Sequence, residues 1–461
     1  MHRIRLGQGG GQFPSQPPIH DRLRSVASGR PSSRRAKPAL IALFLLWTLV
    51  LYDPHWYLAA HGLTVALRAQ VILYLVLAGL LLVNLFQDRA SRQRWQWQLP
   101  ILSFALVGAL TTPFAVNNGV AREWIQEVLL FWLLIVATVA LVDSPRRAER
   151  IFAMYGFSFI WWGAWGSRSG LVGWHHVLSN YDGFGAYMVI GLGLCAFLLV
   201  GSPPGWFRRS MVAALALCVV GIVGSFARGA FLAGIAVFGA VLARSPKRGK
   251  TLMAGVLGGL LVIAAAEVLY PGKFWTEMQS VFQEGTDEGT GEDRWELWMA
   301  ATIVFAERPV LGVGPRNFGP YASTHFETGE IGGRYENNPG GLYNRSLHNL
   351  YFQTLSELGI VGAFVLVLML VDFWRRNAVL RSLAGEQRWL EMGGRLRLPL
   401  LARGLEVAMI GYLVIAAVYS TAGKHWFYTI VAVNLTLHSL VVGTRVTDRE
   451  RLRGRRIMPV P

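Results

Sequence analysis

Long apolar blocks alternate with short polar segments from Ala39 to the C-terminal part of the chain. About 20 helical residues cross the roughly 30 Å of hydrocarbon in a bilayer, and the blocks are about that long. They predict transmembrane helices near residues 38–58, 63–86, 99–115, 124–142, 151–166, 184–200, 210–226, 229–243, 251–270, 348–373, 400–420 and 425–443. The pattern therefore predicts an all-α, polytopic membrane protein with about 12 transmembrane helices.

These blocks divide the chain into five segments. Residues 1–37 contain several Arg, Ser and Pro and predict a disordered basic tail. Nine predicted transmembrane helices follow over 38–270, and three more lie over 348–443. Between them, residues 271–347 form a long polar loop with a predicted amphipathic helix. Residues 444–461 form a second basic tail, so the long loop joins the ninth and tenth predicted helices.

The positions of Lys and Arg predict how these helices are oriented. The chain has 44 Lys and Arg against 27 Asp and Glu, a net charge of +17, and 33 of the 44 fall in the two tails and in alternate loops. Those loops are 87–98, 143–150, 201–210, 244–250 and 374–403. Since basic loops are retained in the cytoplasm, we expect both termini to be cytoplasmic and the long loop to be periplasmic, in a bacterial inner membrane. Membrane topology thus explains the charge better than nucleic-acid binding does.

The long loop contains an acidic stretch and a predicted helix. Gln283–Asp293 is rich in Gly, Asp and Glu, but its spacing fits no EF-hand, so a solvated linker is preferred over a cation site. The segment after it, as far as Pro309, has apolar and aromatic residues at helical spacing, among them Trp295 and Trp298. Two interpretations remain open: a helix at the membrane interface, or a helix packed on the bundle.

Arg228 is the first candidate for chemistry. It lies in a very short outer turn between two predicted helices. A charge at hydrocarbon depth costs at least about 2.5 kcal/mol, so an arginine there needs a reason. Its side chain either reaches the outer headgroups or provides a fixed cation for a phosphate group, which the guanidinium fork binds in a bidentate manner.

His348 is the second candidate, at the start of the tenth predicted helix. A histidine at a helix end is often only an interfacial or capping residue. The positive end of the helix dipole, however, disfavours imidazolium and keeps the ring able to accept a proton near neutral pH. A neutral histidine near arginines fits a general base beside an anionic leaving group.

Three motifs in this chain resemble the O-antigen ligase and O-antigen polymerase (Wzy-type) superfamily of membrane glycosyltransferases. A His-Asn pair opens a predicted helix and is followed by Gly-x-x-Gly, a turn has the pattern Ser/Thr-x-x-Arg-Gly-Ala, and a helix has Arg-x-x-x-Trp with a Pro-x-x-Gly-x-Gly continuation. The matching residues are His348, Asn349, Gly359 and Gly362; Ser225 to Ala230; and Arg294, Trp298, Pro309, Gly312 and Gly314. The resemblance covers most of residues 38–443. Leu347 and Ala227 depart from the proline and serine of many relatives, and neither change removes a functional group.

The resemblance implies a GT-C-like fold and a donor glycan on a polyprenyl (undecaprenyl-type) pyrophosphate. By the same resemblance, transfer to an acceptor hydroxyl proceeds with inversion, without a nucleotide sugar, a metal or another cofactor. Arg228 and Arg294 would bind the pyrophosphate, and His348 would take the proton from the acceptor. Second-rank candidates for lining the site are Arg168, Asn180, Asp182, Arg316, Arg345 and Asn349.

The acceptor distinguishes the functions that this resemblance allows. A ligase uses a lipid A-core sugar in lipopolysaccharide biosynthesis, and the long loop with a single His-Asn motif favours this reading. A polymerase for O-antigen or exopolysaccharide uses another lipid-linked repeat, and a protein hydroxyl is a further variant. The alternative from another class is a 12-helix transporter, which is disfavoured because no internal repeat is evident and the polar candidates gather at the outer rim.

Overall fold

A computed structural model of the chain describes residues 37–62, 69–87, 99–175, 177–269, 289–331, 333–419 and 424–455, together with a few residues between 271 and 279. The predicted tail over 1–37 therefore lies almost wholly outside the described residues, as does the first part of the acidic stretch, 283–288. Within the described residues, the regular elements are α-helices and short 3₁₀ helices, without a β-strand.

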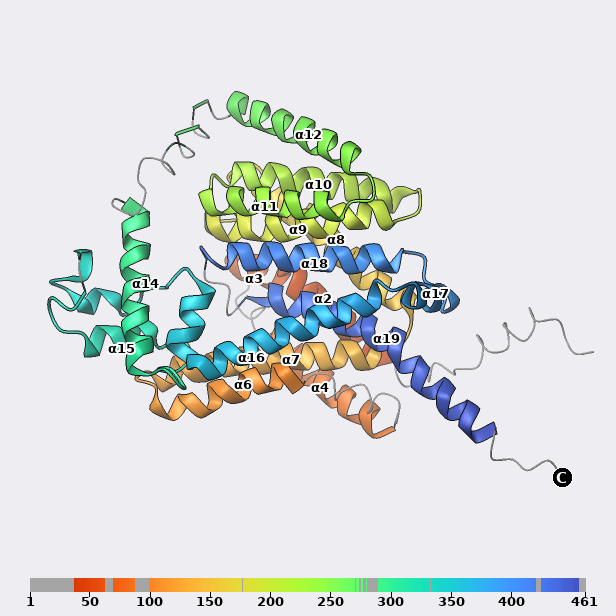
Figure 1. Cartoon of the computed structure of the whole chain (residues 1–461), viewed down its shortest axis with the longest axis horizontal. Coiled ribbons are helices and arrows are strands. Elements are labelled where there is room, and N and C mark those ends of the chain that lie inside the picture. The colour runs from red at the N-terminus through yellow and green to blue at the C-terminus, as the bar shows by residue number, and fades with distance from the viewer. Residues whose placement is uncertain are drawn as a thin grey trace, which may run out of the picture. The chain divides into compact units, whose positions relative to one another are not determined.

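Each predicted transmembrane range overlaps a helix (Figure 1). The first helices are α2 (Lys37–Tyr52), α3 (Pro54–Ala60), α4 (Ala69–Gln87), α6 (Leu99–Thr111), α7 (Asn118–Leu141), α8 (Pro145–Gly166), α9 (Tyr181–Gly201), α10 (Trp206–Gly224), α11 (Arg228–Arg244) and α12 (Arg248–Leu269). The later helices are α14 (Gly289–Glu307), α15 (Phe318–His325), α16 (Leu350–Leu380), α17 (Leu383–Glu391), α18 (Leu398–Ile415) and α19 (His425–Arg455). The 3₁₀ helices are η4 (Thr112–Phe114), η5 (Gly333–Tyr335) and η6 (Pro339–Leu342).

Six of the helices are long and apolar enough to cross a membrane: Asn118–Leu141, Tyr181–Gly201, Trp206–Gly224, Leu350–Leu380, Leu398–Ile415 and His425–Val442. Shorter apolar helices lie at Pro38–Tyr52, Val71–Val83 and Ile101–Phe114. This composition is that of an integral membrane protein with several spans, as the sequence predicted. The count of about 12 spans and the membrane side of each loop stay predictions.

Three element boundaries differ from the sequence-based expectation. The first predicted range is broken at Asp53, where α2 ends and α3 begins. The end of the acidic stretch, from Gly289, belongs to α14, so this part is helical rather than a linker. At the other end of the chain, α19 continues to Arg455, well into the segment predicted as a basic tail. In each case the helix boundary falls where the apolar pattern gives no signal.

Helix α9 lies at the centre of the bundle. It packs against α8, α10, α11 and α18, and Figure 1 shows it between the α10–α11 layer and α18. A helix surrounded by other helices is apolar on all sides, as α9 is. Glycines permit the close approach: a Cβ at Gly185 would lie 2.5 Å from the Ala230 Cβ and 2.7 Å from the Ser225 Oγ. This contact fixes the beginning of α11 against the beginning of α9.

Four of the basic loops predicted to lie on one side of the membrane, 143–150, 201–210, 244–250 and 374–403, meet at one end of the bundle, and residues 88–98 of the fifth lie outside the described residues. The Arg397 amide donates to the Gly201 carbonyl at 3.2 Å, and Glu149 accepts the Leu396 amide at 2.8 Å. Buried Glu406 lies 3.1 Å from the Arg381 Nε and 3.4 Å from the Arg244 Nε. These four loops, which alternate with the others in the sequence, therefore lie together in the fold.

Helix α16 is interrupted at Gly359, whose φ of 64° and ψ of −166° are not helical. The chain that follows α14 fills this break. The Ile360 amide donates to the Pro309 carbonyl at 2.8 Å, and the Gly314 amide donates to the Glu357 carbonyl at 2.9 Å. Side chains are excluded here, since a Cβ at Gly312 would lie 2.4 Å from the carbonyl carbon of Glu357. The break thus couples α14 rigidly to α16.

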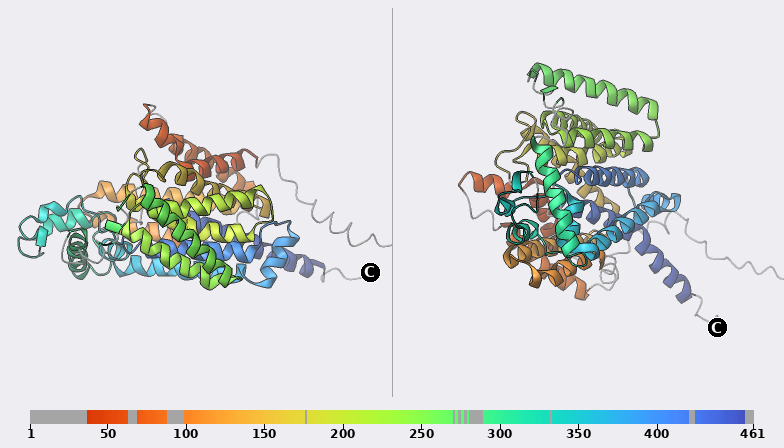
Figure 2. Two further views of the ribbon diagram at one scale, coloured as in Figure 1. Left: turned by 90° about the horizontal axis from the view of Figure 1, so that it is seen from above. Right: turned by 60° about the vertical axis from the view of Figure 1, so that its left-hand side comes forward.

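Helix α14 lies crosswise to α16 (Figure 1), and α15 with the segment leading to α16 lies beside it at the same end (Figure 2). One face of α14 enters a small core of its own with residues of 313–347. That face consists of Leu297, Ala300, Ala301 and Val304. The opposite face carries Trp295, which is 52% exposed, and Met299. One face of α14 is therefore packed against protein, as one of the two interpretations expected. The opposite face is apolar and exposed, so a place at the membrane interface stays open.

Candidate functional site

The starts of three helices gather at the end of the bundle opposite the basic loops. The Leu350 amide of α16 donates to the Ala416 carbonyl at 2.8 Å, just after α18 ends. A Cβ at Gly183 of α9 would lie 2.9 Å from the Tyr419 hydroxyl, and one at Gly229 of α11 would lie 2.6 Å from Val418. The turn after α18 therefore contacts the beginnings of α9, α11 and α16. Asn180, Asp182, Arg228 and His348 lie at or beside these helix starts.

An ion pair links α14 to the first turn of α9. The Arg294 guanidinium lies 3.7 Å from the Asp182 carboxylate. Both side chains remain accessible, at 28% and 36% exposure. Because the ion pair is long and partly hydrated, it holds Arg294 near this end of the bundle while leaving most of its N–H groups available to a ligand.

His348 lies in the loop immediately before α16, with its backbone in the left-handed region at a φ of 49°. Its Nδ1 atom is buried and has no hydrogen-bond partner among the described residues. Burial, and then the nearby Arg294 guanidinium, lower the pKa of His348 below its usual value of 6.5. The ring is thus neutral near pH 7, with a nitrogen that none of the described protein groups satisfies. Left-handed backbone at a non-glycine residue is stored strain of the kind that clusters at functional sites.

Trp298 connects His348 to Arg294. Its Nε1 donates to the Leu347 carbonyl at 2.9 Å, and its ring stacks on Phe352 with centroids 5.5 Å apart. Since Trp298 and Arg294 are one turn apart on α14, this contact fixes the spacing between the guanidinium and the imidazole.

Asn349 completes the start of α16. Its Oδ1 accepts from the Tyr351 and Phe352 amides at 2.9 and 3.1 Å. Its Nδ2 donates to the Ala417 carbonyl at 2.9 Å. The side chain is therefore engaged as the N-cap of α16 and as a link to the turn after α18. In this structure it holds the start of α16 next to His348, and the contact with substrate that the sequence suggested stays a prediction.

Asp293 contacts two further arginines of the long loop. Its carboxylate lies 3.7 Å from the guanidinium groups of Arg334 and Arg345. It also accepts a hydrogen bond of 2.7 Å from the Tyr335 hydroxyl. Arg345 lies over the Tyr335 ring at 5.9 Å. The Arg345 charge also lowers the pKa of His348, so Arg345 belongs to the same electrostatic group as Arg294.

Arg228 is the first residue of α11, at the same end of the bundle. The turn before it is compact: the Ala227 amide donates to the buried Ser225 Oγ at 3.3 Å, and Phe226 has a φ of 51°. The 167–170 turn packs on it, because a Cβ at Gly170 would lie 2.2 Å from the Gly224 carbonyl oxygen. The exposed Arg168 lies in this 167–170 turn. It is therefore close to the turn that leads into Arg228.

Arg316 belongs to a different charged group. Its guanidinium donates to the Glu127 carboxylate of α7 at 2.6 Å, and its amide donates to the Glu357 carboxylate at 2.8 Å. Its charge contributes to lowering the pKa of Lys424, for which burial is the main cause. Of the sequence candidates, Arg316 is thus tied to α7 and to the interior of α16.

Several residues at the site were not foreseen from the sequence. Tyr419 lies 6.4 Å from the His348 ring and accepts from Asn180 at 3.5 Å, while Asp293 and Glu127 hold arginines. Only Asp293 had a signal in the sequence, since it directly precedes Arg294. Among the described residues, no group of three His, Cys, Asp or Glu side chains is arranged to hold a metal ion.

Comparison with known families gives a match to the middle part of the chain. A family model described as O-antigen ligase matches residues 212–367. This range runs from α10 into α16 and includes Arg228, Arg294 and His348, whereas Arg168, Asn180 and Asp182 precede it. Among curated proteins, no match is found.

Proposed function

We propose that the chain transfers a glycan from a polyprenyl-pyrophosphate carrier to an acceptor hydroxyl, a proposal supported by the match of residues 212–367 to the O-antigen ligase family model. The proposed reaction takes place at the periplasmic face of the bacterial inner membrane. The acceptor is a lipid A-core sugar, and the reaction needs neither a nucleotide sugar nor a metal.

The proposal rests above all on Arg294 and His348. A cation on α14 and a neutral imidazole with an unsatisfied buried nitrogen are held together by the Trp298 bridge. Pyrophosphate leaves as an anion, so a fixed guanidinium beside it stabilises the charge that develops as the glycosidic bond breaks. In a partly dehydrated site, such groups serve where other glycosyltransferases use a divalent metal.

In the proposed step, the unprotonated nitrogen of His348 takes the proton of the acceptor hydroxyl. The acceptor oxygen forms a bond to the anomeric carbon from the face opposite the phosphate, which inverts the configuration. The bond from that carbon to the phosphate oxygen breaks, and polyprenyl pyrophosphate leaves with both electrons. Arg228 and Arg294 bind the departing phosphates.

The second-rank residues are assigned by their surroundings. Arg345 and Arg168 border the same surface and are proposed to contact the glycan or the phosphates. Asn180 and Asp182 hold Tyr419 and Arg294 in place. Asn349 supports His348 as a helix cap. For Arg316, the ion pair with Glu127 favours a structural role in joining α7 to the loop.

A polymerase that uses a lipid-linked acceptor remains the alternative, because ligase and polymerase share this chemistry. Deletion of the gene followed by glycolipid gel analysis separates them. Loss of polymer from the lipid A-core, with lipid-linked polymer retained, is expected of the ligase. Shortened chains on an otherwise modified core would identify a polymerase. A glycolipid pattern that does not change in either respect would contradict both.

A further inference from the structure

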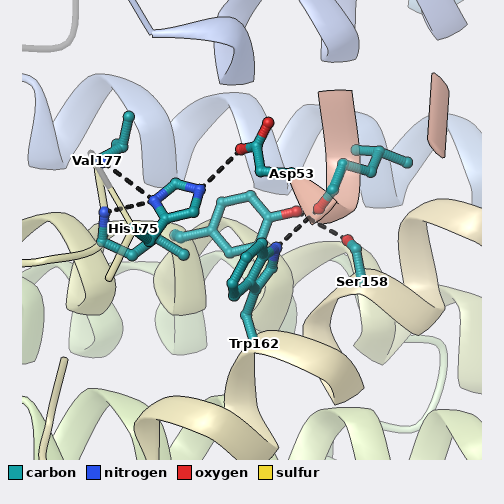
Figure 3. Close-up of polar contacts among 8 residues, drawn as sticks. Asp53, Ser158, Trp162, His175 and Val177 are labelled. Carbon is teal, nitrogen blue, oxygen red and sulfur yellow. Dashed lines mark hydrogen bonds and ion pairs between the residues drawn. The ribbon is translucent and has the colours of Figure 1, made fainter. Parts of the chain in front are cut away.

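A buried acid–histidine pair lies beside the proposed site and has no part in the chemistry above. The His175 Nε2 lies 2.7 Å from the Asp53 Oδ2 (Figure 3). The two residues are 2% and 5% exposed. Asp53 joins α2 to α3, and His175 lies in the loop between α8 and α9. The pair therefore connects the N-terminal part of the chain to the loop that leads into the site.

The hydrogen bonds of His175 fix its protonation. Its Nδ1 accepts from the Val177 amide at 3.0 Å and the Leu178 amide at 2.9 Å. Since Nδ1 accepts, the ring proton is on Nε2 and is donated to Asp53. Burial, and then the Lys424 charge, lower the pKa of His175 to about 3. Both ring nitrogens are occupied by protein groups, so His175 cannot act as a base towards substrate.

Asp53 holds an unusual backbone conformation. Its φ of 42° and ψ of 44° lie in the left-handed region, directly before Pro54. Asp and Asn tolerate this region better than other side chains with a Cβ, and a proline restricts the residue before it. This strained conformation separates α2 from α3. The Asp53 carboxylate is then in contact with His175.

From His175 a chain of contacts runs to the proposed site. The loop closes on itself, with the Val172 amide donating to the Leu178 carbonyl at 2.7 Å. Its Val177 carbonyl oxygen lies against the first turn of α9, where a Cβ at Gly183 would come within 2.2 Å of it. That turn begins with Asn180 and carries Asp182, the partner of Arg294. A shift of the loop therefore displaces the first turn of α9 and the Asp182 carboxylate that pairs with Arg294.

We propose that Asp53 and His175 are positioning residues that fix the 172–180 loop and thereby hold Asp182 against Arg294 for transfer. This inference rests on the proposed function. It assigns a part in the reaction to two residues outside the matched domain. The competing account is that the pair only stabilises the fold, and the two accounts differ in whether the effect of His175 depends on Asp182.

The test compares variants of the full-length protein reconstituted in vesicles. His175→Gln keeps a donor for Asp53, but its amide oxygen cannot take the place of Nδ1 at the same time, so the Val177 and Leu178 amides lose their acceptor. Ser158→Ala is the matched control, since it removes a hydrogen bond of 2.7 Å to Tyr187 in the same buried region without touching the loop. Asp53→Asn keeps an oxygen acceptor for Nε2–H and suits the left-handed backbone. This variant is therefore expected to behave like the wild-type protein in both measurements.

Two measurements are made on each variant. Hydrogen exchange of the 171–183 peptides reports the loop without reference to activity, and it is expected to speed up in His175→Gln alone. Turnover of a polyprenyl-pyrophosphate-linked oligosaccharide is expected to fall about tenfold in His175→Gln, because small misplacements are costly in a preorganised site. In an Asp182→Ala background the same change is expected to cost less than about twofold, because the two residues act through one contact.

Unchanged loop exchange in His175→Gln would overturn the proposal, and so would an undiminished loss of turnover in the Asp182→Ala background. A wild-type protein that transfers no glycan would overturn the proposed function instead. In that case, faster hydrogen exchange in His175→Gln would show that Asp53 and His175 only stabilise the loop.

Discussion

The Ile360 amide donates a hydrogen bond of 2.8 Å to the carbonyl of Pro309, across the break that Gly359 makes in α16. Two motifs far apart in the chain thus form one structure: the Gly-x-x-Gly after His348 opens the helix, and the Pro-x-x-Gly-x-Gly after α14 closes the gap. Because backbone groups in a membrane must be satisfied internally, the inserted segment allows α16 to break without exposing them. The break sets the position of α14, and with it Arg294, relative to His348.

Replacing Gly359 with alanine is expected to destabilise the protein. Its Cβ would lie 2.3 Å from the Val310 carbonyl oxygen, at a φ of 64°. Strain of this kind costs about 1–3 kcal/mol, so the thermal unfolding midpoint should fall by several degrees. Gly258→Ala in α12 is the control, because a Cβ there meets nothing within 4 Å. Equal midpoints for the two variants would be inconsistent with a required break in α16.

The Trp298 bridge gives a second prediction. Trp298→Phe loses the hydrogen bond to the Leu347 carbonyl but keeps an aromatic ring to stack on Phe352. Stability should change by only about 1 kcal/mol, whereas turnover should fall about tenfold because Arg294 and His348 lose their fixed spacing. Trp295→Phe on the exposed face of the same helix serves as the control. If both variants turned over at the same rate, the bridge would have no part in positioning.

The pH dependence of transfer tests the protonation state of His348. Burial and the Arg294 charge lower its pKa below 6.5, so kcat/KM should be constant around pH 7 and fall only at more acidic pH. Asp182 raises this pKa and Arg345 lowers it. Asp182→Asn should therefore move the acid limb to lower pH, and Arg345→Gln should move it to higher pH. Shifts of the opposite signs, or an acid limb that neither variant moves, would exclude His348 as the titrating base.

Substitutions of Arg228 and Arg294 are expected to reduce transfer in different ways. Arg228→Ala is expected to abolish transfer without loss of folded protein, because the departing phosphate loses a cation. Arg294→Lys keeps the charge but loses the guanidinium fork, so partial activity with a raised KM for the lipid-linked donor is expected. Arg208→Ala, at the start of α10 and the opposite end of the bundle, is the matched control. Near-normal turnover by Arg228→Ala would remove that residue from the mechanism.

The sequence predicted the helices well because burial in lipid demands apolar blocks of fixed length, and each predicted range overlaps a helix. The apolar pattern did not predict the break at Asp53, since apolar residues continue on both sides of it, although Pro54 disfavours helical backbone at the residue before it. Nor did it predict the segment inserted at Gly359, whose hydrogen bonds join backbone groups that leave no side-chain signature. Helix boundaries and non-local backbone contacts are thus what the pattern misses.

The candidate site residues were predicted partly from the resemblance to a family and partly from the positions of charged residues along the chain. Arg294 lies close enough to lower the pKa of His348, and the catalytic roles that the motifs imply stay predictions. Arg316 was grouped with them because it lies in the same loop, but its guanidinium pairs with Glu127, which is 189 positions earlier in the chain. Partners so far apart in sequence are set by tertiary packing, so loop proximity alone could not assign Arg316.

The central claim, that His348 is the base for glycan transfer, is tested most directly by His348→Ala in vesicles that contain a polyprenyl-pyrophosphate-linked oligosaccharide and an acceptor glycolipid. Release of polyprenyl pyrophosphate and formation of the glycosylated acceptor are measured together, with the thermal unfolding midpoint as a check on folding. We expect both products to fall at least about 100-fold at an unchanged midpoint. Turnover close to that of the wild-type protein would contradict the account.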